Sequence, residues 1–357
     1  MSNARKLADN LPSVGQLSGR NVITNGGMTI DQRNSGSATT PSADRTYTLD
    51  RWLARMSSGS KYSVQQVTDA PSGYYKSLKV TSAAATTVGT NDYYQINTPL
   101  EGYSVTTFDL GLSTAKKLTL SFWVKSSLTG TFGGAYSNNA GNRFYAWTYT
   151  ISSANTWEHK TITVDGVTDG SWERTNGAGL WVYWTLGAGS GVQGTAGSWG
   201  TTFKRGPTGA TNVVATNGAT WQITGCQLEV GPQSTPFEYE KYGDTLNKCY
   251  RYFFRWKVDA AGGTYNFWNT GYAYSSNGVN IVGQLPVNMR ASPTFNSGGS
   301  FRVCSDSCIN VSAITLSRAN TKTPSITPEG SGFTAGQAYA LGDANDATSF
   351  LNFDAEL

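Results

Sequence analysis

Residues 117–125 read KLTLSFWVK, in which every second residue from Leu118 to Val124 is apolar. Successive side chains of a β-strand point to opposite sides, so this spacing places the four side chains on one face. These side chains are Leu118, Leu120, Phe122 and Val124. A helix would bury side chains at three- and four-residue spacing instead. The stretch therefore predicts a strand in a sheet that covers a hydrophobic core.

Shorter stretches of the same kind lie on both sides of this strand. The segments predicted as strands are residues 50–55, 62–67, 77–80, 143–151, 157–164, 180–186 and 220–228. Turn signals such as Asn25-Gly26-Gly27 and Gly-rich connections such as Gly187–Gly200 separate them. The pattern predicts an all-β chain with a jelly-roll-like β-sandwich over residues 21–245.

Two further regions flank the predicted sandwich. Residues 246–357 are expected to form a smaller C-terminal β-sandwich, which a short helix at 246–254 introduces. Its strands are predicted at residues 279–283, 301–303, 311–316 and 349–353. Residues 1–20 are expected to form a short N-terminal helical arm, since Ala4, Leu7, Ala8 and Leu11 have helical spacing. Such a short helix is unstable alone in water, so we expect it to dock on a partner; a frayed terminus is the alternative.

The composition agrees with this organisation. The 357 residues include 14 Phe, 11 Trp, 19 Tyr and 41 Gly, while charged residues make up only 14%. Aromatic residues favour strands and Gly favours tight turns, so the chain is unlike a helical bundle or a coiled coil. So many aromatic side chains also bury enough area to offset chain entropy, which argues against disorder.

Charge and hydropathy exclude several classes of function. The net charge is +4, and the basic residues are dispersed without a run of five or six, so no nucleic-acid partner is expected. No stretch approaches 18 consecutive apolar residues, so no membrane insertion is expected. The N-terminus lacks the apolar core of a signal peptide, so synthesis in a cytoplasm is expected.

The residues that carry most metal and acid–base chemistry are few. The cysteines Cys226, Cys249, Cys304 and Cys308 are too few for a disulfide scaffold, and we expect ordinary buried or half-buried thiols. Cys304 and Cys308 also have the spacing of half a zinc site, but the chain has one histidine. That residue, His159, lies on a predicted strand without a serine-nucleophile motif nearby, so we expect a surface residue. A pair of carboxylates that cleaves glycans remains an alternative, because the distance between two carboxyl groups depends on the folded structure.

Several segments resemble jelly-roll carbohydrate-binding modules. Residues 21–28, NVITNGGM, resemble the opening N-L-x-x-N-G-x-F of these modules, although Met28 stands where Phe is usual. Residues 120–126, LSFWVKS, are similar to their central strand. Residues 224–231, TGCQLEVG, followed by Pro236-Phe237-Glu238, resemble their closing strand as it occurs in bacteriophage virion proteins. The Gly187–Gly200 loop has no clear counterpart in the family.

The remaining segments resemble bacteriophage tail fibres. The similar segments are residues 4–9, residues 242–253, residues 286–294 and the ending Asp354-Ala-Glu-Leu357. The ordered set resembles a virion appendage protein, which implies a structural and trimeric component of the virion, made in the host cytoplasm. The expected function is that of a tail fibre that adheres to host surface glycans and is not an enzyme. A capsid-attached fibre or adaptor with a purely structural role and a glycan-degrading tailspike are the alternatives. We expect the arm to bind other virion proteins through Leu7 and Leu11.

Candidate ligand contacts are flat aromatic side chains beside polar groups, because sugar rings stack on such faces. In residues 180–184, Trp181 and Tyr183 share one face, and Val182 and Trp184 share the other, so one pair is expected to face solvent. Tyr93, Tyr94 and Trp199 lie in polar or Gly-rich segments and are expected to be exposed. The glycan-binding candidates are therefore Tyr93, Tyr94, Trp181, Tyr183 and Trp199. Packing in cores or subunit interfaces is the alternative role for each.

No catalytic residue and no catalytic metal are assigned. A structural calcium ion is the one cofactor considered, because hard oxygen ligands on loops are common in jelly rolls. Its candidate ligands are Asn25, Asp31 and Glu229, which lie in the segments that resemble the first and last strands of the module.

Overall fold

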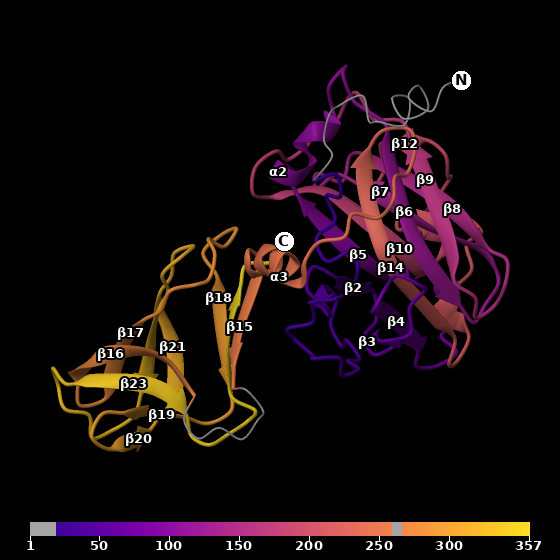
Figure 1. Cartoon of the computed structure of the whole chain (residues 1–357). Coiled ribbons are helices and arrows are strands. Elements are labelled where there is room, and N and C mark those ends of the chain that lie inside the picture. Colours follow the sequence, from indigo (N-terminus) through magenta and orange to yellow (C-terminus); the bar gives the residue numbers. More distant parts are fainter. Residues whose placement is uncertain (1–18, 259–265) are drawn as a thin grey trace. The chain divides into compact units, whose positions relative to one another are not determined.

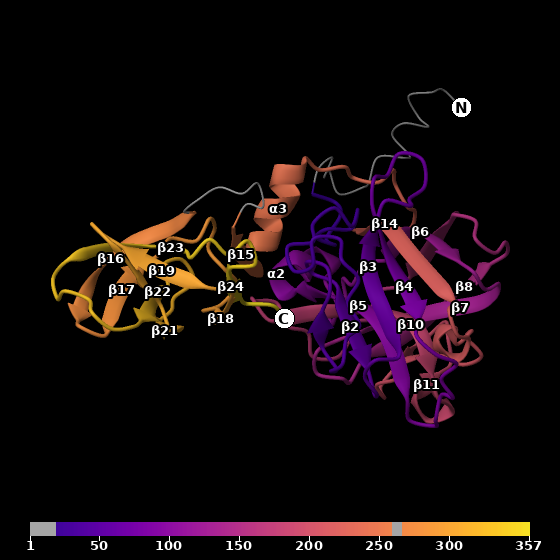
Figure 2. The ribbon, with the colours of Figure 1, turned by 90° about the horizontal axis from the view of Figure 1, so that it is seen from below.

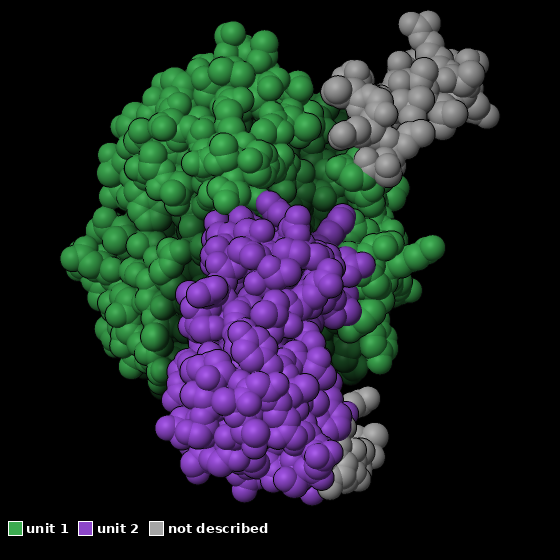
Figure 3. Space-filling model, turned by 90° about the vertical axis from the view of Figure 1, so that its left-hand side faces the viewer, with its two compact units in different colours: residues 1–245, 357 green, residues 246–356 purple. Residues whose placement is uncertain are grey.

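The computed structural model describes residues 19–258 and 266–357 (Figure 1). The chain consists of two compact units (Figure 3). Unit 1 contains the residues up to Thr245 together with Leu357, and unit 2 contains residues 246–356. The predicted helix of the N-terminal arm, with Leu7 and Leu11, lies outside the described residues. No described helix is both long and apolar enough to cross a membrane.

One layer of unit 1 is a five-stranded antiparallel sheet (Figure 2). Its strands, in spatial order, are β3 (Tyr62–Val67), β4 (Ser77–Ser82), β14 (Thr220–Val230), β6 (Leu118–Ser126) and β9 (Glu158–Val164). β6 is the strand predicted from the alternation at residues 117–125, and its four apolar side chains are fully buried.

The other layer of unit 1 is a seven-stranded sheet. Its strands, in order, are β1 (Thr46–Tyr47), β2 (Leu53–Met56), β5 (Tyr93–Glu101), β10 (Ala178–Ala188), β7 (Gly130–Ser137), β8 (Phe144–Ile151) and β12 (Trp199–Gly200). The short strands β11 (Gln193–Gly194) and β13 (Gly206–Pro207) form a separate parallel pair. The short helices are α2 (Gly102–Val105), η1 (Thr106–Phe108), η2 (Ser190–Val192) and η3 (Val213–Ala215).

The main core of unit 1 lies between these two sheets. Trp52, Phe122, Trp184 and Trp221 are completely buried there. The rings of Trp52 and Trp184 lie 5.4 Å apart, and Phe122 meets Trp184 edge-to-face at 5.8 Å. The aromatic-rich composition is thus used to fill a jelly-roll-like β-sandwich, as predicted.

The sequence prediction lacks four strands of the seven-stranded sheet: the two-residue strands β1 and β12 and the longer strands β5 and β7. β5 pairs with β2 and β10, and nearly all of its side chains are buried on both faces, so it shows no polar–apolar alternation. β7 reads GTFGGAYS, and its glycines resemble a loop. Gly134 admits no side chain, because a Cβ there would lie 2.0 Å from the Tyr183 carbonyl oxygen.

Unit 2 is a smaller β-sandwich that follows helix α3 (Tyr242–Tyr250). α3 begins four residues before the predicted helix, whose last residues belong to the first strand instead. The three-stranded sheet has the order β15 (Phe253–Lys257), β24 (Phe350–Asp354) and β18 (Thr294–Gly298). The seven-stranded sheet has the order β20 (Cys308–Asn310), β19 (Phe301–Cys304), β23 (Ala338–Asp343), β16 (Phe267–Ser275), β17 (Gly278–Val282), β22 (Ser325–Glu329) and β21 (Ala313–Arg318). Val303, Leu341, Leu351 and Phe353 are among the fully buried residues of its core.

The structure corrects the expectation that all four cysteines are thiols, since Cys304 and Cys308 form a disulfide. The hairpin of β19 and β20 places these two residues directly opposite each other in its register. The spacing that resembled half a zinc site is therefore that of a short hairpin loop. Cys226 and Cys249 are buried.

Candidate functional site

Three of the predicted aromatic side chains, Tyr93, Trp181 and Tyr183, share the outer face of the seven-stranded sheet of unit 1. Tyr183 lies opposite Asn97, and Tyr93 lies further along β5, opposite Ala188. The rings of Trp181 and Tyr183 stack with centroids 6.2 Å apart and an interplanar angle of 15°. Such a stack resembles a platform in shape, so its exposure decides what it can bind.

The expectation that one face of this strand meets solvent is wrong. Val182 and Trp184 belong to the main core, while Trp181 and Tyr183 are only 5% and 3% exposed. A second apolar cluster covers Trp181 and Tyr183; it includes Leu53, Phe144, Phe203 and Leu357. The physical reason is that loops of unit 1 fold over the outer face of the sheet, which strand periodicity does not reveal.

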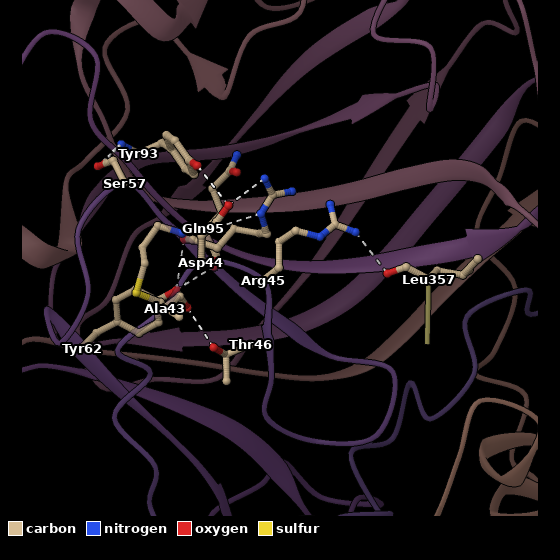
Figure 4. A network of polar contacts seen from close by, with 11 residues as sticks. Ala43, Asp44, Arg45, Thr46, Ser57, Tyr62, Tyr93, Gln95 and Leu357 are labelled. Atoms are coloured by element: carbon tan, nitrogen blue, oxygen red, sulfur yellow. Dashed lines mark hydrogen bonds and ion pairs between the residues drawn. The ribbon is translucent and has the colours of Figure 1, made fainter. Parts of the chain in front are cut away.

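Polar contacts hold the edge of this face in place (Figure 4). Asp44 accepts hydrogen bonds from Arg55 Nε at 2.8 Å and from the Tyr93 hydroxyl at 3.2 Å. Burial alone raises the pKa of Asp44, but the hydrogen bonds and charge of Arg55, with the Met56 amide, outweigh it and lower that pKa. Tyr93 is half-buried, and the Arg205 guanidinium lies 3.9 Å from the centre of its ring. Tyr93 thus takes part in a structural network.

The carbonyl oxygen of Leu357 also lies at this edge, where it accepts hydrogen bonds from Arg45 and from the Tyr47 hydroxyl. Leu357 belongs to the same compact unit as these two residues. Arg45 also lies 5.2 Å from the centre of the Trp181 ring. This arrangement helps to cover the stacked pair.

The other two predicted residues lie elsewhere. Tyr94 is 1% exposed, because it occupies the inward-facing position next to Tyr93 on β5; its predicted exposure is wrong. Trp199 is half-buried on β12, where its indole N–H donates to the Asp165 carbonyl oxygen at 2.8 Å. Its ring meets Tyr145 and Trp172 edge-to-face at 5.3 and 5.9 Å. The five predicted side chains therefore do not form one surface.

A pocket of about 180 Å³ lies at a different place in unit 1. Three segments far apart in the sequence line it: residues 21–29, residues 73–75 between β3 and β4, and residues 237–245 after β14. Asn21 attaches the first segment to β14, because its side-chain amide donates to the Cys226 carbonyl oxygen at 3.0 Å and accepts from the Leu228 amide at 3.1 Å. The opening N-x-x-x-N-G motif therefore builds one wall of the pocket.

Aromatic side chains make the opposite wall of this pocket. The Tyr74 ring lies 5.4 Å from Phe237 and 5.6 Å from Tyr239, and Phe237 meets Tyr239 edge-to-face at 5.0 Å. Tyr75 is 71% exposed and Tyr239 is 63% exposed. Burial raises the pKa of Tyr74, and its hydrogen bond to Tyr239 raises it further, so its hydroxyl stays protonated. The wall thus offers the protonated hydroxyl of Tyr74 and the exposed side chains of Tyr75 and Tyr239.

Two carboxylates add polar acceptors to the lining. Glu238 accepts hydrogen bonds from the backbone amides of Gly19 and Asn21. Partial burial acts to raise the pKa of Glu238, but these amides and the charge of Arg20 outweigh it and lower that pKa. Glu240 accepts from the Thr245 hydroxyl at 3.3 Å. Among the described residues that line the pocket there is no basic side chain.

The sequence prediction did not include this pocket. The signals available were a turn, Pro71-Ser-Gly-Tyr-Tyr75, and the alternation Phe237-Glu-Tyr-Glu240. Neither signal shows that these two segments meet, because more than half of unit 1 separates them in the sequence.

The candidate calcium ligands have other roles in the structure. The Asn25 amide donates to the carbonyl oxygens of Ile30 and Asp50, each at 2.9 Å. Asp31 accepts from backbone amides of the following turn, and Glu229 accepts from the amide and the hydroxyl of Thr235. Within residues 19–258 and 266–357, no group of three or more His, Cys, Asp or Glu side chains is suited to hold a metal ion.

No family model matches the chain, and no curated protein matches its sequence. Among solved structures, the enzymatically active domain of tailspike protein 4 of bacteriophage CBA120 matches with 10% identity and a TM-score of 0.34. That match covers 59% of this chain and 21% of the tailspike chain, so this chain spans about a fifth of the tailspike's length.

Two carbohydrate-binding modules also match. TmCBM61, solved with β-1,4-galactotriose, is 11% identical, with 59% of this chain and 99% of that chain covered and a TM-score of 0.30. The family 11 module of a cellulosomal cellulase of Clostridium thermocellum is 14% identical, with 56% and 98% covered and a TM-score of 0.26.

Proposed function

We propose that this chain is a structural protein of a bacteriophage virion, a tail fibre that adheres to host surface glycans without cleaving them. Two observations support this function. The ordered motifs along nearly the whole chain resemble those of virion appendage proteins, and unit 1 has a pocket. In this proposal the protein is made in the host cytoplasm and is incorporated into the virion through its N-terminal arm, residues 1–20.

The observation that carries glycan binding is the open pocket with the exposed rings of Tyr75 and Tyr239 at its rim. A sugar ring has apolar C–H faces and a polar edge, and it is held by aromatic faces together with hydrogen-bond acceptors. The pocket supplies both, since Glu238 and Glu240 lie beside these rings.

The carboxyl groups of unit 1 support a role without cleavage. Glycoside hydrolysis uses two carboxyl groups, one of them a general acid with a raised pKa. The pKa of Glu238, in the pocket, is lowered. Burial raises the pKa of Asp50, but Asp50 is 1% exposed and bonded to Gln32 away from the pocket lining. The pocket residues thus fit a binding site better than an acid–base pair.

The test uses the purified full chain and surface polysaccharide from the host bacterium. We expect the chain to bind the polysaccharide and to release no reducing ends. Tyr239→Ala should lower the affinity by roughly three- to tenfold, because one stacked ring contributes about 0.5–1.5 kcal/mol. Tyr103→Ala is the matched control, since Tyr103 is 59% exposed on α2 and lies outside the pocket. Release of reducing ends would indicate a glycan-degrading tailspike, and absence of binding would leave a structural adaptor.

The place of the protein in the particle is tested separately. Antibody labelling of intact virions should mark the tail; a label over the head would indicate a capsid-attached fibre. We also propose a homotrimer, for which light scattering should give three times the chain mass of 38.2 kDa. A mass of one chain at micromolar concentration would contradict the trimer.

A further inference from the structure

We propose that the pocket is one end of an extended binding track for a neutral oligosaccharide, and that the track crosses the outer face of the five-stranded sheet to His159. This inference rests on the proposed glycan-binding function and adds the class of ligand and its path. The track consists of the pocket residues Phe237, Tyr239 and Tyr74, followed by Trp123 and His159.

The first step of the track is the connection from the pocket to the sheet. The Tyr74 ring lies 5.6 Å from that of Tyr239, and the Tyr239 hydroxyl donates to the Gly73 carbonyl oxygen at 3.0 Å. Tyr74 also packs against β14, since a Cβ at Gly225 would lie 2.7 Å from its ring atoms. On the side of β6, the Tyr74 hydroxyl interacts with the Trp123 side chain, which acts to lower the pKa of Tyr74. The aromatic wall of the pocket therefore borders the outer face of β14 and β6.

The second step is across neighbouring strands. Trp123 on β6 lies directly opposite His159 on β9, and the two ring centroids are 5.3 Å apart. Trp123 points away from the core, because its neighbours Phe122 and Val124 point inward and are fully buried. His159 lies on the same face, because directly opposite residues of paired strands share a face. Trp123 is half-buried and His159 is exposed. The aromatic groups therefore continue from the pocket to the last strand of the sheet.

Polar groups lie beside this row of rings, as a sugar chain requires for its hydroxyls. Lys125, two residues from Trp123 on the same face, forms an ion pair with Asp69. The Trp157 indole N–H donates to Asp69 at 3.4 Å, and the Trp157 ring lies 5.1 Å from the Lys125 ammonium group. Rings and hydrogen-bonding groups thus occur side by side along the track.

Charge selects the ligand class. The pocket lining carries the carboxylates of Glu238 and Glu240, and beside it lie Arg20, whose charge acts on Glu238, and Lys76, whose ammonium group is 5.0 Å from the centre of the Tyr75 ring. The two signs of charge balance there, so the pocket end has no excess of positive charge that would favour a carboxylate- or phosphate-bearing sugar. At the sheet end, the basic Lys125 is already paired with Asp69. A neutral chain is therefore the ligand that fits the whole length of the track.

The experiment measures how affinity depends on chain length. The probes are glucan, galactan, mannan and N-acetylglucosamine oligomers of one to six sugar residues, with galacturonate oligomers as the acidic comparison. The full chain is first screened on these probes, and the best series is then titrated calorimetrically. We expect the affinity of the wild-type chain to rise with length and galacturonate oligomers to bind at least tenfold more weakly than neutral ones.

Variants separate the track from the pocket. His159→Ala and Trp123→Phe should weaken binding of the longest oligomers by roughly three- to tenfold, while the shortest bound oligomers keep wild-type affinity. Tyr239→Ala should weaken oligomers of every length, and Tyr103→Ala should change none. His159→Ala carries the test if Trp123→Phe alters folding, because His159 is exposed.

The outcomes distinguish the two proposals. If both track variants bind long oligomers as the wild type does, while Tyr239→Ala weakens all lengths, the track is wrong and the pocket function stands. If galacturonate binds as tightly as the neutral series, the ligand class is wrong. If the wild-type chain binds no oligomer and no host polysaccharide, the proposed function and the track both fail.

Discussion

The carboxylate of Asp44 connects two strands at the outer face of the seven-stranded sheet of unit 1. It bonds to Arg55 on β2, to the backbone amide of Met56 and to the hydroxyl of Tyr93 on β5. The side chain of Arg55 is only 10% exposed, and that of Asp44 is 33% exposed. A nearly buried guanidinium needs a charged acceptor, so this pair is worth more than an ion pair on the open surface.

Replacing Asp44 with Asn should lower the free energy of unfolding by about 1–3 kcal/mol at pH 7, because Arg55 loses its charged acceptor. The pKa of Asp44 is lowered in the folded chain, so its stabilising effect is complete above the unfolded pKa and is lost as pH falls through the folded one. Urea unfolding from neutral to acid pH should therefore show the difference between variant and wild type shrink. A difference that stays constant down to low pH would contradict the assignment.

Asp165→Asn is the matched control for this experiment. Asp165 pairs with Lys117, but its side chain is 79% exposed, and such surface pairs contribute little. The Asp165 variant should unfold at nearly the same urea concentration as the wild type at every pH.

The irregularity of strand β14 connects the sheet with the pocket. The register between β14 and β6 shifts between Thr224 and Gln227, and Gly225 has a φ of +62° at this bulge. A Cβ at Gly225 would lie 2.7 Å from ring atoms of Tyr74. The bulge therefore leaves the space in which the aromatic wall of the pocket packs against the sheet.

Gly225→Ala should destabilise unit 1 by roughly 1–2 kcal/mol, because L-residues avoid the left-handed region, and it should also weaken glycan binding by displacing Tyr74. Gly209→Ala is the control, since Gly209 has a φ of +79° but a Cβ there would meet nothing within 4 Å. The control should lose similar stability and keep its glycan affinity, as calorimetric titration and urea unfolding would show. Unchanged affinity in Gly225→Ala would mean that Tyr74 does not shape the pocket.

The whole molecule combines two β-sandwiches with an N-terminal segment of different composition. The segment carries Ala4, Leu7, Ala8 and Leu11 at helical spacing, with Arg5, Lys6 and Asp9 between them. A helix over these residues would be too short to be stable alone, so the proposed function gives this segment the role of attachment to the virion.

Deleting residues 2–15 should leave both units folded and remove the protein from assembled particles. Leu7→Asp should have the same effect, because it places a charge on the apolar face. Immunoblots of purified virions measure incorporation, and Lys6→Ser, on the opposite face, should incorporate normally. Normal incorporation of the truncated chain would place the attachment surface on the β-sandwiches instead.

The sequence alone predicted those strands of unit 1 whose local pattern is strong. The alternation of β6 predicted its bounds to within one residue, and β3 was predicted at its observed bounds. β10 and β14 are buried on both faces and were still predicted, because their apolar and aromatic residues favour strands. β5 and β7 were missed, because Gln95, Asn97 and Pro99 interrupt the apolar pattern of β5 and the glycines of β7 resemble a loop.

The candidate site depended on the tertiary structure. Periodicity placed Trp181 and Tyr183 together on one face, but only the folded chain shows the loops that cover them. The pocket is made when residues 21–29, 73–75 and 237–245 meet beside β14, and no local pattern encodes the meeting of segments so far apart. The sequence thus determined an aromatic-rich β-sandwich protein, whereas long-range packing decided which aromatic rings remain open to a ligand, because exposure is a property of the whole fold.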